Sequence, residues 1–257
     1  MQSFKTQGIV LKGSNFGEAD KILTIFTERF GKIKVIAKGI RKIKSHLAGA
    51  LEPFILSDLQ LHEGKTFYIV TGASIVEDFP KIKGDINQIA KAFFVGELID
   101  NFASESERLI EIFALFLATL KELNGPNRPV ILQAFQLKLV EAAGFKPELY
   151  HCLHCKKEIV PNQNFWDDQE GGLICFACHT QTHHGFPVTD QFIKLMHFFE
   201  RSDLSEIRRM NISEQLGAEM EKNLENYLHH LLEKELKSSR FIKLLHNEKH
   251  KDNKCEE

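Results

Sequence analysis

Short runs of β-branched and aromatic residues recur through the first 80 residues of the chain, and glycines separate them. Runs of this length and composition, bounded by glycine, are typical of β-strands. The pattern predicts strands over residues 7–11, 22–26, 33–37, 54–61 and 67–76. Within the first 80 residues, only residues 45–50 resemble a helix. Five strands in so short a segment predict a small antiparallel barrel of the OB type, with an SH3-like barrel as the nearest alternative.

The spacing of apolar residues becomes helical after Pro80. Apolar positions recurring every three or four residues predict helices over residues 85–102, 106–123, 190–200 and 213–236. A further helix is bounded by Pro129, just inside its start, and Gly144, just past its end. Asn211, followed three residues later by Glu214, is a candidate cap for the last helix.

These segments predict an α+β protein of several domains. An N-terminal five-stranded OB-fold barrel is followed by an all-helical domain that carries a four-cysteine zinc-knuckle insert. We expect a DNA-binding barrel over residues 1–80 and a helical domain over 81–150 and 186–245. The insert covers 151–185, and the polar segment 246–257 is expected to be a disordered tail.

Composition places the chain among ordinary globular proteins. Of its 257 residues, 43% are hydrophobic and 26% are charged, which is enough apolar material to bury a core. No apolar run approaches the roughly 18 residues that a membrane helix needs, and the first residues do not resemble a secretory signal. We therefore expect a cytoplasmic protein, in which cysteines are thiols or metal ligands more often than disulfides.

Four cysteines form two C-x-x-C pairs, and nineteen residues separate the pairs. Each pair brings two sulfurs onto one tight turn, and two such turns complete a tetrahedron around zinc. The predicted ligands of one structural zinc ion are Cys152, Cys155, Cys175 and Cys178. The insert is short and polar, so we expect the metal to supply its folding energy.

Other interpretations of the insert stay open. Two disulfides are disfavoured by compartment, and no thioredoxin-like unit surrounds either pair. A nearby histidine is an alternative ligand, from the set His151, His154, His179, His183 and His184. Four thiolates leave no open position for hydrolytic chemistry. The acidic residues between the pairs are interpreted as solvated turn residues (Asp167, Asp168 and Glu170), and Cys255 has no assigned role.

Positive charge is concentrated in residues 29–45, RFGKIKVIAKGIRKIKS, which hold seven Lys or Arg residues and no carboxylate. Alternation along the strand puts three lysines on one face, and a basic loop follows Gly39. The predicted DNA-binding residues are Lys32, Lys34, Lys38, Arg41, Lys42 and Lys44. A row of fixed cations suits a phosphate backbone and is tolerant of sequence. The alternatives are a solvated edge-strand face and a surface that binds an acidic protein partner.

The chain shows no recognisable catalytic motif. The triplet Gly64-Lys65-Thr66 lacks the upstream glycine of a phosphate-binding loop, and no GxSxG or GxGxxG occurs. We therefore predict that the protein is not an enzyme. A non-enzymatic scaffold, whose barrel and zinc knuckle bind proteins, is the competing class.

The order of these parts resembles the RecO family of bacterial recombination mediators. The resemblance rests on AKGIRKIKS followed by LEPF, on LVEAAGFKPELYHCLHC, and on GGLICFACH. It implies binding of single- and double-stranded DNA, annealing of complementary strands, and loading of RecA together with RecR onto DNA coated by single-stranded-DNA-binding protein (SSB), whose tail is a further partner. It also implies a bacterial, nucleoid-associated protein. Many zinc knuckles have glycine after the first cysteine pair, where this chain has Lys156, so that turn is expected to differ.

Overall fold

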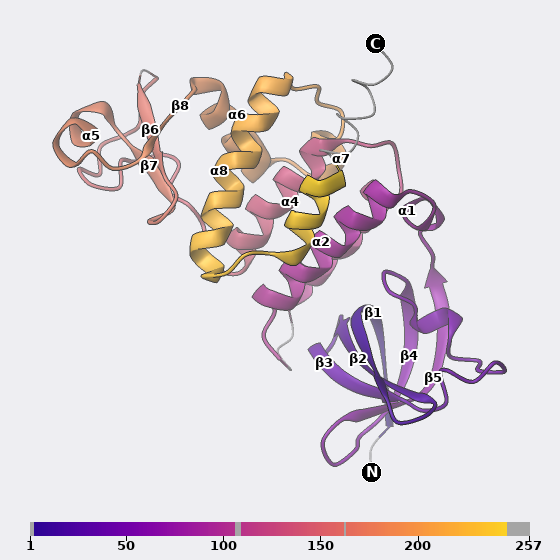
Figure 1. Ribbon diagram of the computed structural model, residues 1–257. Helices are drawn as coiled ribbons and strands as arrows, with labels where there is room; N and C mark the ends of the chain where they lie inside the picture. The colour runs from indigo at the N-terminus through magenta and orange to yellow at the C-terminus, as the bar shows by residue number, and fades with distance from the viewer. Residues whose placement is uncertain (1–2, 106–108, 162, 246–257) are drawn as a thin grey trace. The chain divides into compact units, whose positions relative to one another are not determined.

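The computed structural model describes residues 3–105, 109–161 and 163–245 (Figure 1). Packing divides the chain into two compact units, which are described separately. The first contains the described residues of Met1–Pro126 and Lys237–Glu257, and the second is Asn127–Leu236. The helices that follow the barrel as far as residue 126 therefore belong to its unit. The division by function, with a DNA-binding domain that ends at residue 80, stays a prediction.

Five strands close into a barrel, as predicted. They are β1 (Ser3–Phe16), β2 (Asp20–Thr27), β3 (Gly31–Ala37), β4 (Leu56–His62) and β5 (Tyr68–Glu77), in the order β1-β2-β3-β5-β4. Four of the pairings are antiparallel, but β3 and β5 pair in parallel at Val35–Tyr68 and Ile36–Ile69. The expected all-antiparallel barrel is corrected at this seam.

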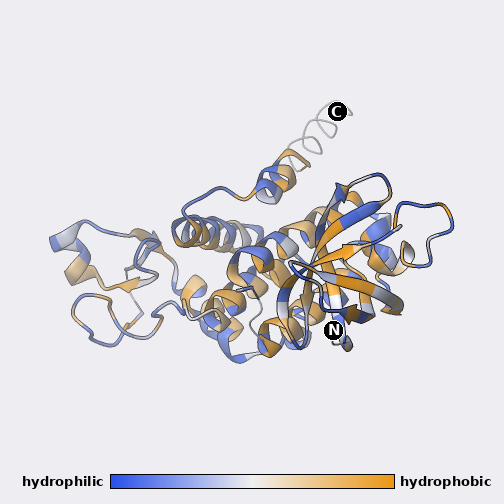
Figure 2. Ribbon diagram, turned by 90° about the horizontal axis from the view of Figure 1, so that it is seen from below, coloured by the Kyte–Doolittle hydropathy of each residue, from blue (hydrophilic) through white to orange (hydrophobic). Residues whose placement is uncertain are grey.

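Strand β1 is longer than the pattern predicted because it has two partners. Its first half pairs with β4 from Ser3, and its second half pairs with β2 as far as Phe16. Alternate residues of each strand point inward and form the barrel core, which includes Val10, Leu23, Ile25, Ile33, Val35, Leu59, Leu61 and Val70. Hydrophobic and hydrophilic stretches accordingly alternate along these strands in Figure 2.

Helices complete the first unit. They are η1 (Gly49–Leu51), α1 (Pro80–Gly84), α2 (Ile86–Phe102) and α3 (Ile110–Leu123), and residues 237–245 are also helical. The aromatic rings of α3 pack on the barrel, with Phe113 5.8 Å and Phe116 6.4 Å from the ring of Phe26. The carboxylate of Glu97 accepts hydrogen bonds from the backbone N–H groups of Lys237 and Ser238, which fixes the start of the C-terminal helix.

The second unit packs helices against a small sheet. Its helices are α4 (Pro129–Ala142), α5 (Phe176–Thr182), α6 (Asp190–Arg201), α7 (Leu204–Ile207) and α8 (Glu214–Leu232). Its strands β6 (Asn164–Asp167), β7 (Gly172–Ile174) and β8 (Phe186–Val188) are antiparallel in the order β7-β6-β8. Helix α8 is capped by Ser213, whose hydroxyl accepts from Leu216 N at 3.2 Å, so the predicted cap at Asn211 is wrong.

Some predictions fall outside this description. The expected disordered tail, 246–257, and Cys255 within it lie beyond the described residues. Among the residues that are described, no helix is both long and apolar enough to cross a membrane.

Candidate nucleic-acid interface and metal centre

Strand β3 alternates as its sequence predicted, but its outer face is not a row of free cations. Lys32 is largely buried, donates to the backbone oxygen of Asp100, and lies 3.6 Å from the carboxylate of that residue. Lys34 pairs with Glu105 at 2.7 Å. Asp100 also forms an ion pair with Lys12. Two of the six predicted DNA-binding residues therefore have carboxylate partners, Asp100 of α2 and Glu105 in the segment that follows it.

The other four cations lie after the strand and are exposed: Lys38, Arg41, Lys42 and Lys44. No carboxylate among the described residues forms an ion pair with any of them. We call residues 38–45 the basic loop. The cations of this region that lack a carboxylate partner among the described residues therefore lie in the basic loop and not on the face of β3.

The basic loop is fastened to the turn between β1 and β2. Gly39, with a φ of 64° that favours glycine, donates its N–H to the carboxylate of Asp20 at 2.7 Å. Arg41 donates its backbone N–H to Ala19 O at 2.9 Å and its guanidinium to Glu18 O at 3.1 Å. These contacts hold the backbone, while the lysine side chains stay in water. Their partners are carbonyls and one carboxylate far away in sequence, which is why pattern analysis missed them.

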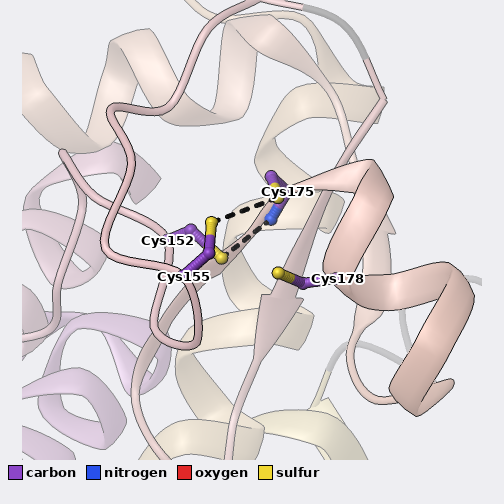
Figure 3. A group of neighbouring side chains, drawn as sticks. All are labelled: Cys152, Cys155, Cys175 and Cys178. Carbon is purple, nitrogen blue, oxygen red and sulfur yellow. Dashed lines mark hydrogen bonds between the residues drawn. The ribbon is translucent and has the colours of Figure 1, made fainter.

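The four cysteines of the insert come together, as their spacing predicted (Figure 3). Their sulfur atoms all lie within 4.8 Å of one another, and those of Cys155 and Cys175 are 3.8 Å apart. A tetrahedron with metal–sulfur bonds of about 2.3 Å has edges of about 3.8 Å. The distance is far longer than the roughly 2.05 Å of a disulfide. The cluster therefore has the donor set and spacing of a tetrahedral metal site.

Hydrogen bonds to the sulfur of Cys152 favour its thiolate form, which is the form that binds a metal cation. Burial raises the pKa of Cys152, but N–H groups of Cys175, Cys155 and His154 outweigh it and lower that pKa to about 6. The Cys175 N–H lies 3.4 Å from this sulfur. Burial and the neighbouring sulfurs raise the pKa of Cys178 to about 12. Four thiolates repel one another, so full deprotonation needs a cation among them.

The first cysteine turn keeps the backbone shape that a glycine would favour. Lys156 has a φ of 59°, and its N–H donates to Cys152 O at 3.0 Å. The turn was expected to differ because this chain has Lys156 in place of glycine, but only the residue type differs. Lys156 therefore adopts a left-handed conformation that is strained for a residue other than glycine.

Two of the neighbouring histidines, His179 and His151, have partners other than the cysteine cluster. His179 stacks on Phe165 with ring centroids 3.5 Å apart, and its Nδ1 lies 2.6 Å from His184 O. His151 lies 3.6 Å from the carboxylate of Glu148. Within the described parts of the chain, the metal-competent cluster consists of cysteines alone.

Two expectations about the insert are corrected. Trp166 is fully buried and packs edge-on against Phe192 and Tyr227, so the insert has an apolar anchor in its own unit. Asp167 and Asp168 are buried rather than solvated. Asp167 accepts the N–H groups of Gln169 and Glu170 and so holds the turn between β6 and β7. The pattern identified the turn but could not show that helix α8 covers it through His230, 3.6 Å from Asp168.

Comparison with known proteins decides the family. The family model described as "Recombination protein O N terminal" matches residues 1–79, and "Recombination protein O C terminal" matches residues 83–240. The chain belongs to the RecO family. The boundary between the two RecO matches falls at the start of α1, directly after the barrel.

Relatives that match more than 90% of the chain support the same family. The chain is 35% identical to "DNA repair protein RecO" of Dehalococcoides mccartyi over 91% of this chain and 93% of the relative. It is 31% identical to the protein of that name from Desulforamulus reducens and 30% identical to that from Bacillus subtilis, with 96% of each chain covered in both cases. The barrel, the basic loop and the cysteine cluster therefore all lie within the region shared with RecO proteins.

Proposed function

We propose that this protein is a DNA repair and recombination mediator that binds single- and double-stranded DNA through the basic loop. The exposed cations of a loop anchored on a barrel support this proposal most directly. Each cation that meets a phosphate releases a condensed counterion, which supplies affinity without reading sequence. The name of the relatives, DNA repair protein RecO, points to the same class of ligand.

The proposed activity is annealing of complementary strands. Cations that neutralise phosphates lower the repulsion between two strands and leave base edges free to pair. This step forms no covalent bond, so it requires no nucleophile and no catalytic base. We propose accordingly that the protein is not an enzyme.

The resemblance described above extends the proposal to partners. The protein would act with RecR to load RecA onto DNA that is coated by SSB, and it would contact the SSB tail. We propose accordingly that it acts in the bacterial cytoplasm, in association with the nucleoid. The cysteine cluster would hold one structural zinc ion through Cys152, Cys155, Cys175 and Cys178, with no open position for a substrate.

A salt titration of single-stranded DNA binding tests the proposal. If Lys38, Arg41, Lys42 and Lys44 each neutralise one phosphate, log affinity should fall with log salt at a slope of about −2.8. The double variant Lys42→Ala/Lys44→Ala should have a slope flatter by about 1.4 and should anneal strands more slowly. The matched control is Lys65→Ala/Lys81→Ala, which removes two exposed lysines of the same unit outside the loop.

An unchanged slope in the Lys42→Ala/Lys44→Ala variant would contradict the placement of the DNA-binding surface. Wild-type protein that fails to bind DNA at low salt, yet binds an acidic protein, would favour the scaffold instead. Incubation of the protein with DNA and magnesium should leave the DNA intact.

A further inference from the structure

The basic loop carries one apolar side chain that contacts nothing in the barrel. Ile43 has a relative exposure of 105%, which is the exposure of an isolated residue. The hydrogen bond from Ser45 N to Lys42 O, 2.9 Å long, makes a turn with Ile43 and Lys44 at its centre. Turn centres usually hold glycine, proline or small polar residues, so a β-branched apolar residue there gains nothing from folding.

The loop does not place Ile43 outside for lack of apolar contacts. Ile40, three residues earlier, is buried in the barrel core, and Leu47, four residues later, packs against the same core. The start of the loop is fastened at two points: Gly39 donates its N–H to the carboxylate of Asp20 at the start of β2, and Arg41 donates its guanidinium to Glu18 O in the β1–β2 turn. With an anchor on each side, Ile43 stays exposed, and its neighbours along the chain are the exposed Lys42 and Lys44.

Other exposed apolar residues of the barrel lack this setting. Ile75 is 52% exposed on β5, where the following charged residue is Glu77. Phe16 is 47% exposed at the end of β1, where Glu18 and Asp20 follow. Single exposed apolar residues need no explanation, but one flanked in sequence by two exposed lysines matches a ligand that is both anionic and apolar. Single-stranded DNA has this character, with phosphates along the chain and unpaired bases beside them.

We propose that Ile43 contacts the faces of unpaired bases while Lys42 and Lys44 hold the flanking phosphates. This inference rests on the proposed function and names the residue through which the loop acts on bases. Apolar wedges of this kind insert between base steps in other DNA-binding proteins and partly unstack them. An aliphatic wedge makes no hydrogen bonds, so it leaves the pairing edges free and does not select sequence.

The test compares Ile43→Ser with the matched variant Ile75→Ser, which makes the same change at an exposed isoleucine of the same barrel. Binding is measured with a single-stranded oligonucleotide and with an abasic oligonucleotide of equal length. Ile43→Ser should bind the normal strand about fivefold more weakly, on the scale of covering half an isoleucine side chain. Its salt slope should be unchanged because no charge is lost. Ile43→Ser should bind the abasic strand as tightly as the wild type does. Ile75→Ser should match the wild type in its affinity for both strands and in its salt slope.

A spectroscopic measurement reports the bases directly. Two adjacent 2-aminopurines quench each other while stacked, so a wedge that separates them raises their fluorescence. The wild type and the conservative variant Ile43→Leu should produce this rise on binding, and Ile43→Ser at saturating concentration should not.

The outcomes separate this inference from the proposed function. One outcome is that the wild type binds the strand with the expected salt slope, and Ile43→Ser binds and unstacks it equally well. The role of Ile43 is then overturned, while the proposed function stands. The same holds if Ile43→Ser weakens abasic and normal strands equally, since the change would then act on the loop and not on bases. If the wild type shows no salt-dependent binding, the proposed function itself fails.

Discussion

Lys34 of β3 and Glu105 form an ion pair 2.7 Å long at the surface of the barrel unit. The hydrogen bond to Glu105 raises the pKa of Lys34, and the same bond lowers the pKa of Glu105. Both groups are charged at neutral pH, and these shifts move each pKa further from neutrality, so the two charges cancel each other locally. The strand lysines thus differ from the loop lysines: Lys32 and Lys34 have carboxylate partners, whereas the loop lysines have none among the described residues.

Removing this carboxylate should strengthen DNA binding. In Glu105→Gln, Lys34 loses its ionic partner and becomes available to a phosphate, so we expect a salt slope steeper by about 0.7 and tighter binding at low salt. Filter binding over a range of salt concentrations measures both. The control is Glu63→Gln, which removes an exposed glutamate elsewhere in the barrel. Equal gains in the two variants would mean that net charge alone matters and that Lys34 does not reach DNA.

The cysteine cluster predicts one zinc ion per chain by elemental analysis. Removing the metal with a chelator should lower the melting temperature, because the metal–sulfur bonds that join the two cysteine turns are lost. Cys152→Ser/Cys175→Ser should lose the metal and unfold at a lower temperature than the wild type. Cys255→Ser, which changes the fifth cysteine, should keep both properties. Metal-free protein with unaltered stability would refute the site.

The sequence predicted those parts of the fold that repeat a local pattern. The alternation in β3 and the helical spacing of α6 and α8 each reflect one buried face, so they could be predicted from the sequence. Helix α4 is buried on most sides and was predicted from the proline and glycine at its ends. The short strands β6–β8 were missed because each has only three or four residues and depends on its partners. The same reason explains the missed helix α5, which begins at Phe176 directly after Cys175 of the cluster.

The candidate sites divide in the same way. The cysteine cluster follows from two local turns, and sequence spacing was enough to predict it. The charges of Lys32 and Lys34 could not be assessed locally, because Asp100 and Glu105 lie about seventy residues later in the chain. Alternation shows which side chains point outward, but only the fold shows what they meet there.

Gly96 of α2 is a position where the barrel and a helix approach closely. A Cβ at this residue would lie 2.9 Å from the ring of Phe54. Phe54 has a φ of 60° and packs edge-on against Phe93 at 4.9 Å, so its ring has little freedom to move. Gly96→Ala should therefore destabilise the protein by about 1–2 kcal/mol, although alanine favours helices.

Urea unfolding measures this difference, and Gly84→Ala is the control. Gly84 ends α1, and an added Cβ would meet no atom within 4 Å. That variant should be within about 0.5 kcal/mol of the wild type. If both variants are equally stable, the contact between Gly96 and Phe54 does not limit packing.

Glu200 makes the second unit sensitive to acid. Burial raises the pKa of this carboxyl, but hydrogen bonds from Lys146 and Tyr150 outweigh it and hold the pKa below its ordinary value. The Tyr150 hydroxyl donates to the carboxylate at 2.7 Å, and Lys146 pairs with it. A carboxyl with a depressed pKa stabilises the fold above its unfolded pKa of about 4.3, and this stabilisation is lost as pH falls through the folded value.

Glu200→Gln should therefore be less stable than the wild type by about 1 kcal/mol at pH 7, and the difference should shrink as the pH falls from about 5 to 3. Fluorescence of the chain's single tryptophan, Trp166, follows urea unfolding at each pH within the same unit. Glu221→Gln, an exposed change on α8, should match the wild type throughout. A difference between Glu200→Gln and the wild type that stays constant with pH would show that the charge of Glu200 does not stabilise the fold.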